Sequence, residues 1–577
     1  MSGNRTGRRL ACATILAVLG AAAAGCVPVA GRGGGENGQS FGESGLGNYL
    51  AGRFARSERD AAAAAAFYEQ ALADDLDNET LLQRSLLLHL AQGQMDRARP
   101  LATRRVREHP KDAMAQIYLA VEDFRDGRYE QARQRLAGIE RSGLAFVLQP
   151  VLLAWLEQAE GRPEAALSAL AELEDQEGLA SFREFHAALL NQVAGRTAAA
   201  AEAFAALGRL TANSDLRVAQ AQAGLFASEQ RWQEAERLLA EQLARVPDNA
   251  GIIQALAQAR ARSGPEAIVR NAREGAAEAL YGSAASLSQE RAGELARIYV
   301  HLALHLRPDF DGARLLLAEL LERDQRWDEA RAVYERIPRQ SPHSWDARLR
   351  AALTFGRSER HEEAIERLRQ LTGERPDDLL AATSLGDLLR GRERYAEAAA
   401  AYGRAIARLD TMEERHWSLL YARGIAHERA KQWPLAEADF QQALKLKPEQ
   451  PLVLNYLGYS WIEQGIHLDR ALKMVERAVE QRPNDGYIVD SLGWAHYRLG
   501  SWDRALRYLE RAVELRPEDP VINDHLGDAF WRSGRRLEAR FQWQRALQLK
   551  PDGELAEKIR RKLEDGLAPA EPSPAAR

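Results

Sequence analysis

The sequence predicts an all-α protein, a superhelical solenoid of stacked helix-turn-helix repeats, and three observations predict it. An alanine recurs with a period of 34 residues over most of the 577-residue chain. Apolar residues around these alanines follow helical spacing. Glycines and prolines fall at fixed distances from them, where helices end. A fixed period of this length is typical of a solenoid, whose units stack because one helical hairpin cannot bury both of its apolar faces.

The composition limits the partners. Apolar residues make up 46% of the chain and charged residues 28%. A chain of this length and composition can bury a large core and ordinarily divides into several domains. The formal net charge is only -5, and nucleic-acid binding depends on a basic surface that this chain does not supply. We therefore expect no nucleic-acid partner.

The N-terminus has the pattern of an export signal over residues 1–25. Arg5, Arg8 and Arg9 precede the apolar run Leu10–Ala24, whose 15 residues are too few to span a bilayer comfortably. We therefore expect the run to be removed with the signal and to form no part of the folded protein.

The segment "AAGC", Ala23 to Cys26, resembles the lipobox of bacterial lipoproteins. The resemblance implies cleavage before Cys26 and lipidation of that cysteine, whose acyl chains would anchor the protein to a membrane. Ala23 departs from the lipobox pattern, in which a larger aliphatic residue is usual, so cleavage at an Ala-x-Ala site remains an alternative. Val27 follows the cysteine, and by resemblance to bacterial sorting rules it implies the periplasmic face of the outer membrane, with the inner membrane as the alternative.

Residues 26–48 are Gly-rich and polar, which predicts a tether between the lipid and the folded body. Gly33, Gly35 and Gly38 within this segment spell GxGxxG. A dinucleotide-binding loop needs a strand before it and a helix after it, whereas here a signal peptide precedes and more glycine follows. We interpret the three glycines as part of the tether.

Fourteen alanines mark the repeats from residue 49 onward, and nine of the thirteen gaps between them are 34 residues. A glycine often stands five residues before the alanine, and a proline often stands twelve residues after it. These repeat alanines are Ala64, Ala98, Ala132, Ala166, Ala200, Ala235, Ala296, Ala330, Ala364, Ala398, Ala436, Ala471, Ala505 and Ala539. They predict about 14 helical hairpins.

The spacing also predicts the division of the chain. The step from Ala235 to Ala296 is 61 residues, so we expect an N-terminal solenoid at 49–248, an irregular helical break at 249–290 and a C-terminal solenoid at 291–552. Residues 553–577 are expected to be a capping helix followed by a disordered tail, since the edge of a solenoid needs a polar outer face.

One repeat illustrates the chemistry of a unit. In "ALRYLERAVEL" the apolar residues from Ala505 onward fall on one helical face and the charged residues face away. Gly500 stands where the preceding helix needs a left-handed residue to end. The small residues Gly493 and Ala505 predict a close approach of the two helices. Aromatic residues three positions before several repeat alanines, such as Tyr129 and Trp502, are expected to belong to the core.

These repeats resemble the tetratricopeptide repeat, whose signature combines Leu-Gly, a large residue, alanines and a proline. One well-matched copy has Leu492, Gly493, His496, Ala505, Leu509, Ala512 and Pro517, and the next has Leu526, Gly527, Phe530, Ala539, Trp543, Ala546 and Pro551. Copies before residue 250 are degenerate and rich in alanine. The resemblance covers most of the chain and implies a protein-binding scaffold.

No pattern of residues predicts catalysis. His301 and His305 stand four residues apart, which is the spacing of a metal-binding pair, but no HExxH glutamate or third ligand accompanies them. Walker-loop and kinase signatures do not occur in the sequence. We therefore expect no catalytic residue, no metal site and no cofactor, and a protein that is not an enzyme.

A second resemblance refines the expected function. "LNYLGYSWIEQG" and "DSLGWAHYRLG", with "GAAEALYGSAASL" in the middle of the chain, resemble the large tetratricopeptide lipoproteins of Gram-negative bacteria. That group includes the adaptor of a periplasmic carboxyl-terminal processing protease that degrades cell-wall hydrolases. The resemblance implies an adaptor for such partners. The alternative is a scaffold for assembly or export of an outer-membrane polysaccharide, pilus or secretin.

The first helices of such repeats are expected to line a concave groove that holds a partner segment. In the C-terminal repeats the residues predicted to point into it are Tyr421, Asn455, Tyr459, Asp490, Trp494, Tyr497, Asp524, Asp528 and Trp531. This set is aromatic and acidic and contains no lysine or arginine, which favours an internal or basic partner segment. The alternative is that Trp494 and Trp531 pack between adjacent repeats.

Overall fold

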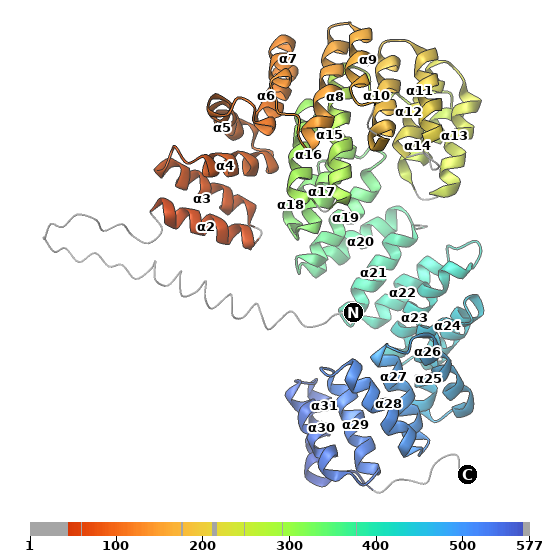
Figure 1. Cartoon of the computed structure of the whole chain (residues 1–577). Coiled ribbons are helices and arrows are strands. Elements are labelled where there is room, and N and C mark those ends of the chain that lie inside the picture. Colours follow the sequence, from red (N-terminus) through yellow and green to blue (C-terminus); the bar gives the residue numbers. More distant parts are fainter. Residues whose placement is uncertain are drawn as a thin grey trace, which may run out of the picture. The chain divides into compact units, whose positions relative to one another are not determined.

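The computed structural model describes residues 44–58, 60–174, 177–210, 216–246, 249–290, 292–376 and 378–568. Within these ranges the regular structure consists of helices α2 to α31 and two short 3-10 helices, and none of it is strand (Figure 1). The predicted all-α repeat fold is therefore confirmed. The export signal, Cys26 and most of the predicted tether lie outside the described residues.

The chain forms two compact units. One contains the residues up to Glu122 together with Gln134–Ala145, and the other contains Asp123–Arg133 together with the residues from Phe146 onward. The first unit holds α2 (Gly45–Ser57), α3 (Ala61–Asp74), α4 (Glu79–Ala91) and α5 (Met95–Glu108), and it shares α6 (Ala113–Arg125) and α7 (Tyr129–Ala137) with the second.

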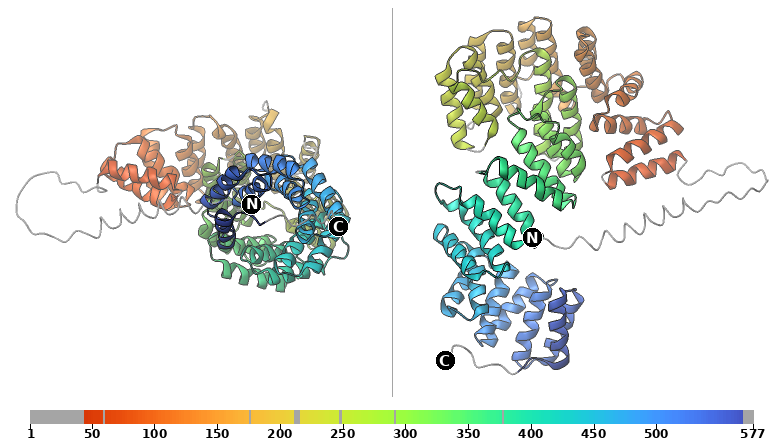
Figure 2. Two further views of the ribbon diagram at one scale, coloured as in Figure 1. Left: turned by 90° about the horizontal axis from the view of Figure 1, so that it is seen from below. Right: turned by 180° about the vertical axis from the view of Figure 1, so that it is seen from behind.

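The helices from α8 onward form the second unit, apart from the first two residues of α8, and successive hairpins are neighbours in space (Figure 2). They are α8 (Leu144–Ala159), α9 (Pro163–Ala171), α10 (Ala180–Val193), α11 (Thr197–Leu210), α12 (Leu216–Ser228), α13 (Trp232–Arg245), α14 (Ala250–Arg260), α15 (Ala272–Gln289), α16 (Gly293–Leu306), α17 (Asp311–Arg323), α18 (Trp327–Tyr334), α19 (Ser344–Arg357), α20 (His361–Glu374), α21 (Leu379–Gly391), α22 (Tyr395–Ile406), α23 (Trp417–Arg429), α24 (Trp433–Leu446), α25 (Pro451–Gln464), α26 (Leu468–Gln481), α27 (Gly486–Arg498), α28 (Trp502–Leu515), α29 (Pro520–Arg532), α30 (Arg536–Gln548) and α31 (Gly553–Asp565).

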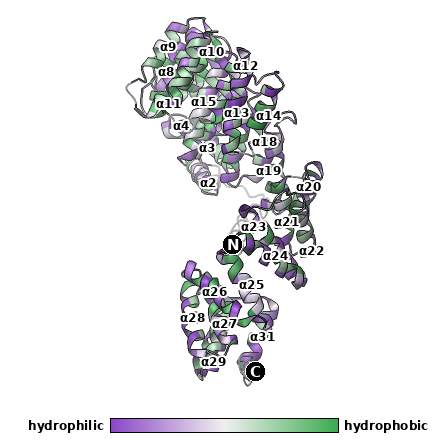
Figure 3. Ribbon diagram, turned by 90° about the vertical axis from the view of Figure 1, so that its right-hand side faces the viewer, coloured by the Kyte–Doolittle hydropathy of each residue, from purple (hydrophilic) through white to green (hydrophobic). Residues whose placement is uncertain are grey.

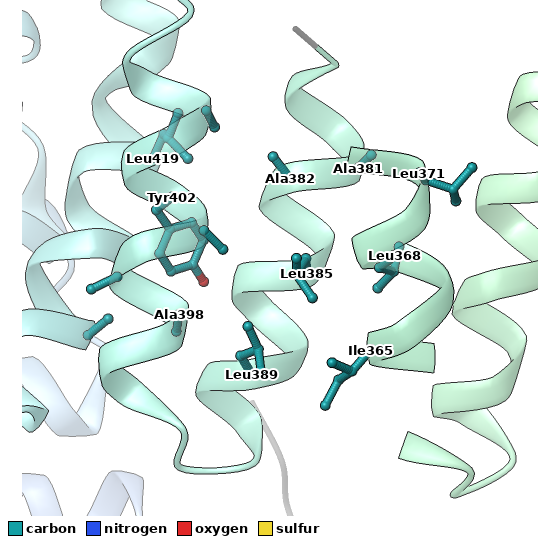
Figure 4. Close-up of a cluster of buried hydrophobic side chains, with 14 of the residues drawn as sticks. Ile365, Leu368, Leu371, Ala381, Ala382, Leu385, Leu389, Ala398, Tyr402 and Leu419 are labelled. Carbon is teal, nitrogen blue, oxygen red and sulfur yellow. The ribbon is translucent and has the colours of Figure 1, made fainter. Parts of the chain in front are cut away.

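The fourteen repeat alanines set the register of the hairpins. Each lies on the second helix of a pair, from α3 to α30, and each is fully buried. Figure 4 shows one such junction, where Ala398 and Tyr402 of α22 face Leu385 and Leu389 of α21. The predicted register is therefore confirmed for every repeat. Individual helices carry both hydrophilic and hydrophobic residues, as one buried face requires (Figure 3).

The turn inside most hairpins contains one residue in the left-handed conformation, five positions before the repeat alanine. Gly500 has a φ of 76°, as the sequence predicts. The same conformation occurs at Gln325, Glu359 and Glu393, with φ between 61° and 65°. The geometry of the hairpin therefore imposes this conformation even where the residue carries a side chain.

The aromatic residues three positions before the repeat alanines are half-buried and lie at the margin of the core, as Trp433 does against the cluster that contains Phe440. Each is the first residue of its helix, as Tyr395 is in α22 and Trp502 in α28. A residue at that position lies at the edge of the hairpin, which explains its partial exposure.

Helix α15 is unusual because small residues occupy most of its length and eleven of its residues are buried. It packs against α10 and pairs with α16. A Cβ at Gly275 would lie 2.4 Å from the ring of Trp155 on α8. Arg217 of α12 donates two hydrogen bonds to Glu278 of α15, at 2.8 and 2.6 Å. α15 thus covers the first helices of three preceding hairpins.

None of the described helices is long and apolar enough to cross a membrane.

Candidate partner-binding groove

A cavity of about 1030 Å³ opens on the second unit, where the first helices of three successive hairpins meet. The first helices of the hairpins together form a surface that we call the first-helix face, and the cavity opens on it. Residues of α17, α19 and α21 supply most of the lining. The lining residues are Glu319, Glu322, Arg323, Trp327, Asp346, Leu349, Arg350, Leu353, Gly356, Arg357, Ala364, Leu380, Ser384, Asp387 and Leu388.

One arginine in the cavity is shared by three carboxylates. The guanidinium of Arg350 lies 3.2 Å from Glu319, 3.6 Å from Glu322 and 3.2 Å from Asp346. Burial raises the pKa values of Glu319 and Glu322 above the usual range, although Arg350 partly opposes this effect. The whole lining has four carboxylates and three arginines, so its formal balance is one negative charge, which favours a cationic group from outside only slightly.

Apolar side chains complete the cavity. Leu349 of α19 is buried, whereas Leu353 of α19 and Leu388 of α21 are half-buried beside it. Leu380 of α21 is 61% exposed. The arrangement suits a ligand that presents an apolar side chain next to a basic one, because the first would be desolvated against leucine and the second would meet the carboxylates.

The same face is occupied elsewhere in the second unit. Trp155 lies eleven residues before its repeat alanine, as Leu353 does in the cavity, and its ring is covered by Gly275 of α15. The occupant is a helix of small residues with Glu278 as an acidic anchor for Arg217. The first-helix face is therefore built to accommodate a helical segment.

Three of the residues predicted for the groove are half-buried on α23 and α25. Tyr421 packs edge-on against Tyr456, with ring centroids 5.9 Å apart. Burial raises the pKa of Tyr459. The side-chain oxygen of Asn455 is buried and makes no hydrogen bond. Among these three residues only Asn455 has an unpaired buried oxygen.

The predicted acidic residues of the groove are buried and paired. Nδ1 of His525 lies 3.0 Å from the carboxylate of Asp490. Burial lowers the pKa of His525, but Asp490, Asp524 and Asp528 outweigh it and hold the pKa above its usual value. These carboxylates were predicted to line an open groove, whereas they are buried and Asp490 is paired with His525 inside the fold.

Lys562 of α31 is a second partner of these carboxylates. Its ammonium lies 2.8 Å from both Asp524 and Asp528 of α29. The indole of Trp543 also donates to Asp528, at 2.9 Å. Burial raises the pKa of Asp528 to about 6, and Lys562 opposes that effect. The expectation of a groove without lysine is also wrong, because the terminal helix supplies one from outside the repeats.

Trp494 packs between adjacent repeats, which is the alternative that the sequence left open, whereas Trp531 packs within its own hairpin. Trp494 stacks on Tyr497 at 4.5 Å and on His525 of the following hairpin at 4.0 Å. Trp531 packs against Trp543 at 5.3 Å. These rings are therefore engaged within the fold at the C-terminal end.

The cavity residues were missed, although the register that selected the predicted set also points to them. Trp494 and Asp528 stand eleven residues before their repeat alanines, and so do Glu319, Leu353 and Asp387. The same count applied to the repeats of Ala330, Ala364 and Ala398 would have found three lining residues. The sequence could not show which stretch of the face remains open.

The histidine pair does not form a metal centre with neighbouring ligands. Burial, with Arg297 and Arg326 nearby, lowers the pKa of His301 to about 4. His305 lies against Arg125. Among the residues that the structure describes, no group of three or more histidine, cysteine or carboxylate side chains is placed to hold a metal ion.

Comparison with known proteins identifies the repeat. One sequence model described as tetratricopeptide repeat matches residues 86–142, 349–413, 421–486, 467–520 and 491–554, and a second matches residues 275–354. Together they cover more than half of the chain. The chain belongs to the tetratricopeptide repeat family. Proteins of this family generally mediate protein–protein interactions, and their fold is typically a scaffold without catalytic activity.

One relative is TPR repeat-containing protein PA4667 of Pseudomonas aeruginosa, 26% identical over 192 residues. The match spans 33% of this chain and 32% of that protein, so about a third of each.

Two solved structures are also similar. A chain of the APC/C hetero-tetramer Cut9-Hcn1 matches 90% of this chain and 96% of its own length, at 14% identity and a TM-score of 0.36. YrrB, described as a TPR protein with an unusual peptide-binding site, matches 34% of this chain and 97% of its own length, at 21% identity and a TM-score of 0.26.

Proposed function

We propose that this tetratricopeptide protein is a non-catalytic adaptor, tethered to a membrane in the periplasm, whose cavity between α17 and α21 holds a segment of a partner protein. The observation that carries this proposal is the composition of the cavity. Leu353, Leu380 and Leu388 offer apolar contact beside the carboxylates around Arg350. The partner segment would present apolar and basic side chains, in keeping with the charge of the site.

A test of the cavity compares two exposed leucines. Leu380 lies in the cavity and is 61% exposed, and Leu435 lies on α24, outside the cavity, and is 52% exposed. Leu380→Asp should lower partner recovery from gently solubilised membranes by roughly tenfold or more, since a desolvated contact is replaced by a charge. Leu435→Asp is the matched control. Equal recovery with both variants would contradict binding at this cavity.

The sequence resemblance supports a finer role, in which the partners are a periplasmic carboxyl-terminal processing protease and the cell-wall hydrolases that it degrades. In cells, loss of the protein or the change Leu380→Asp should raise the levels of particular periplasmic hydrolases. A defect in polysaccharide, pilus or secretin assembly with unchanged hydrolase levels would favour the alternative scaffold and contradict the protease adaptor.

We also propose that Cys26 carries the lipid anchor. The "AAGC" segment and the preceding apolar run support this assignment. Mass spectrometry of the mature N-terminal peptide should show a chain that begins at Cys26 and carries acyl modification. An unmodified N-terminus cut at an Ala-x-Ala site would contradict it.

A further inference from the structure

Helix α2 is the first helix of the first hairpin, and its two faces differ. Asn48, Gly52 and Ala55 form the buried face. A Cβ at Gly52 would lie 3.2 Å from the ring of Tyr68, so this face packs closely on α3. The opposite face carries three exposed apolar side chains spaced four residues apart: Leu46 (69% exposed), Leu50 (53%) and Phe54 (60%).

Helix α31, at the other end of the solenoid, has the polar outer face that is usual for a terminal helix. On α31 the exposed positions are charged, with Glu554, Glu557, Lys558 and Arg561 all largely exposed. Terminal helices of repeat proteins need such a polar outer face to stay in water. α2 departs from this rule, because its apolar stripe has no covering partner among the described residues.

We propose that the stripe Leu46–Leu50–Phe54 of α2 lies on the surface of a phospholipid membrane. Residues 27–43, seventeen in all, separate Cys26 from Ser44 at the start of α2. A chain of that length reaches at most roughly 65 Å. The inference rests on the proposed lipid at Cys26, which would keep α2, the nearest described helix, within that distance of the bilayer.

The charges of α2 fit an anionic lipid surface. Arg53 is exposed and lies between Leu50 and Phe54 in sequence, on the same side of the helix. Arg56 occupies the last turn, and the helix contains no acidic residue; Glu58 follows it as the C-cap. An amphipathic helix with apolar side chains on one face and arginine beside them lies in the plane of the membrane interface. A second protein copy would require no such basic flank.

The test places an environment-sensitive fluorophore on the full-length chain at Leu50→Cys, with Gln70→Cys on α3 as the matched control. Gln70 is also exposed and belongs to the same hairpin. The parent chain, treated with the same label, is the blank for any free thiol at Cys26. Each protein is reconstituted into vesicles of phosphatidylethanolamine and phosphatidylglycerol that contain a quencher attached to the acyl chains.

The label at position 50 should shift to shorter wavelength and be quenched at least about twofold more than the label at position 70, because the apolar face enters the interface. Equal, weak quenching at both positions would overturn the proposal, even if mass spectrometry showed lipid on Cys26. Shielding of position 50 without vesicles, growing with protein concentration, would also overturn it and assign the stripe to a second copy. Absence of lipid on Cys26 would refute the anchor alone, because quenching at position 50 would still report contact between α2 and the vesicles.

Discussion

Within each hairpin the two helices meet where one residue is small and its neighbour is large. At Gly386, Gly493 and Gly527 an added Cβ would lie 2.4 to 2.6 Å from the large residue of the second helix. In the second hairpin the sizes are reversed, with buried Leu86 on the first helix and buried Ala102 on the second. Because the combined volume of the two facing residues is conserved, the degenerate early repeats retain the fold.

The repeat alanines offer the first prediction. Ala505 is fully buried at such a junction, so Ala505→Leu should lower the free energy of unfolding by roughly 1 to 3 kcal/mol through overpacking. The control is Arg507→Leu on the exposed face of α28, expected to change it by less than about 0.5 kcal/mol. Chemical denaturation of both variants is the measurement. Equal midpoints for the two would contradict the register.

Buried His186 offers the second prediction, which concerns pH. The indole of Trp155 donates to Nδ1 of His186 at 3.2 Å, and burial lowers the pKa of the histidine from 6.5 to about 3. At pH values between about 3 and 6.5, His186 binds a proton in the unfolded chain but not in the folded chain. Stability should therefore fall as the pH falls below 6.5, by up to about 1.4 kcal/mol per pH unit from this group.

His186→Gln isolates that contribution, because glutamine still accepts the indole hydrogen bond but does not titrate. Urea unfolding at pH 7.5, 6.0 and 5.0 should show a smaller loss of stability for the variant than for the parent chain. The same pH dependence in both proteins would mean that His186 protonates within the fold.

At the scale of elements, the hairpin turns explain which residue types the repeat tolerates. Gly500 was predicted to be left-handed from its place after a helix, whereas Gln325 and Glu393 adopt the same conformation without a glycine to indicate it. The closely packed helices on either side fix the geometry of the turn. Packing therefore outweighs the strain of one residue with a Cβ.

The turn gives a third prediction, in which replacement by alanine has opposite effects on the free energy of unfolding at two glycines. Gly500 has a φ of 76°, so Gly500→Ala should lower the free energy of unfolding by roughly 1 kcal/mol. Gly373 lies in the last turn of α20 with open space around it, so Gly373→Ala should raise it by up to about 0.5 kcal/mol, less than in a helix interior. Thermal and chemical melts measure both. Stabilisation by Gly500→Ala would contradict the turn geometry.

Two helices could not have been placed from sequence periodicity. The pattern of α15 predicts a helix, but not that Gly275 meets Trp155, 120 positions earlier in the chain. The register put Asp524 and Asp528 in a groove, whereas both are buried against Lys562, which lies on α31, beyond the last repeat. Helical period specifies which side of a helix is buried, and it carries no information about which distant segment covers it.

At the scale of the whole second unit, the first-helix face is used in three ways. α15 covers this face on α8 and α12. Lys562 of α31 neutralises the carboxylate of Asp524 at the C-terminal end of the face. Between them the cavity of α17 to α21 remains open. The period was sufficient to predict fourteen hairpins and the positions that face inward. It was insufficient to locate the open stretch, because that depends on the two covering helices.

The most direct test of binding in the cavity is site-specific photocrosslinking in living cells. A photoreactive amino acid at Ser384, which lines the cavity, should form an adduct with a discrete partner protein, and the added change Leu380→Asp should abolish that adduct. The same amino acid at Leu435, exposed outside the cavity, should form no such adduct. Absence of any protein adduct from Ser384, or the same adduct from Leu435, would contradict the cavity as the partner-binding site.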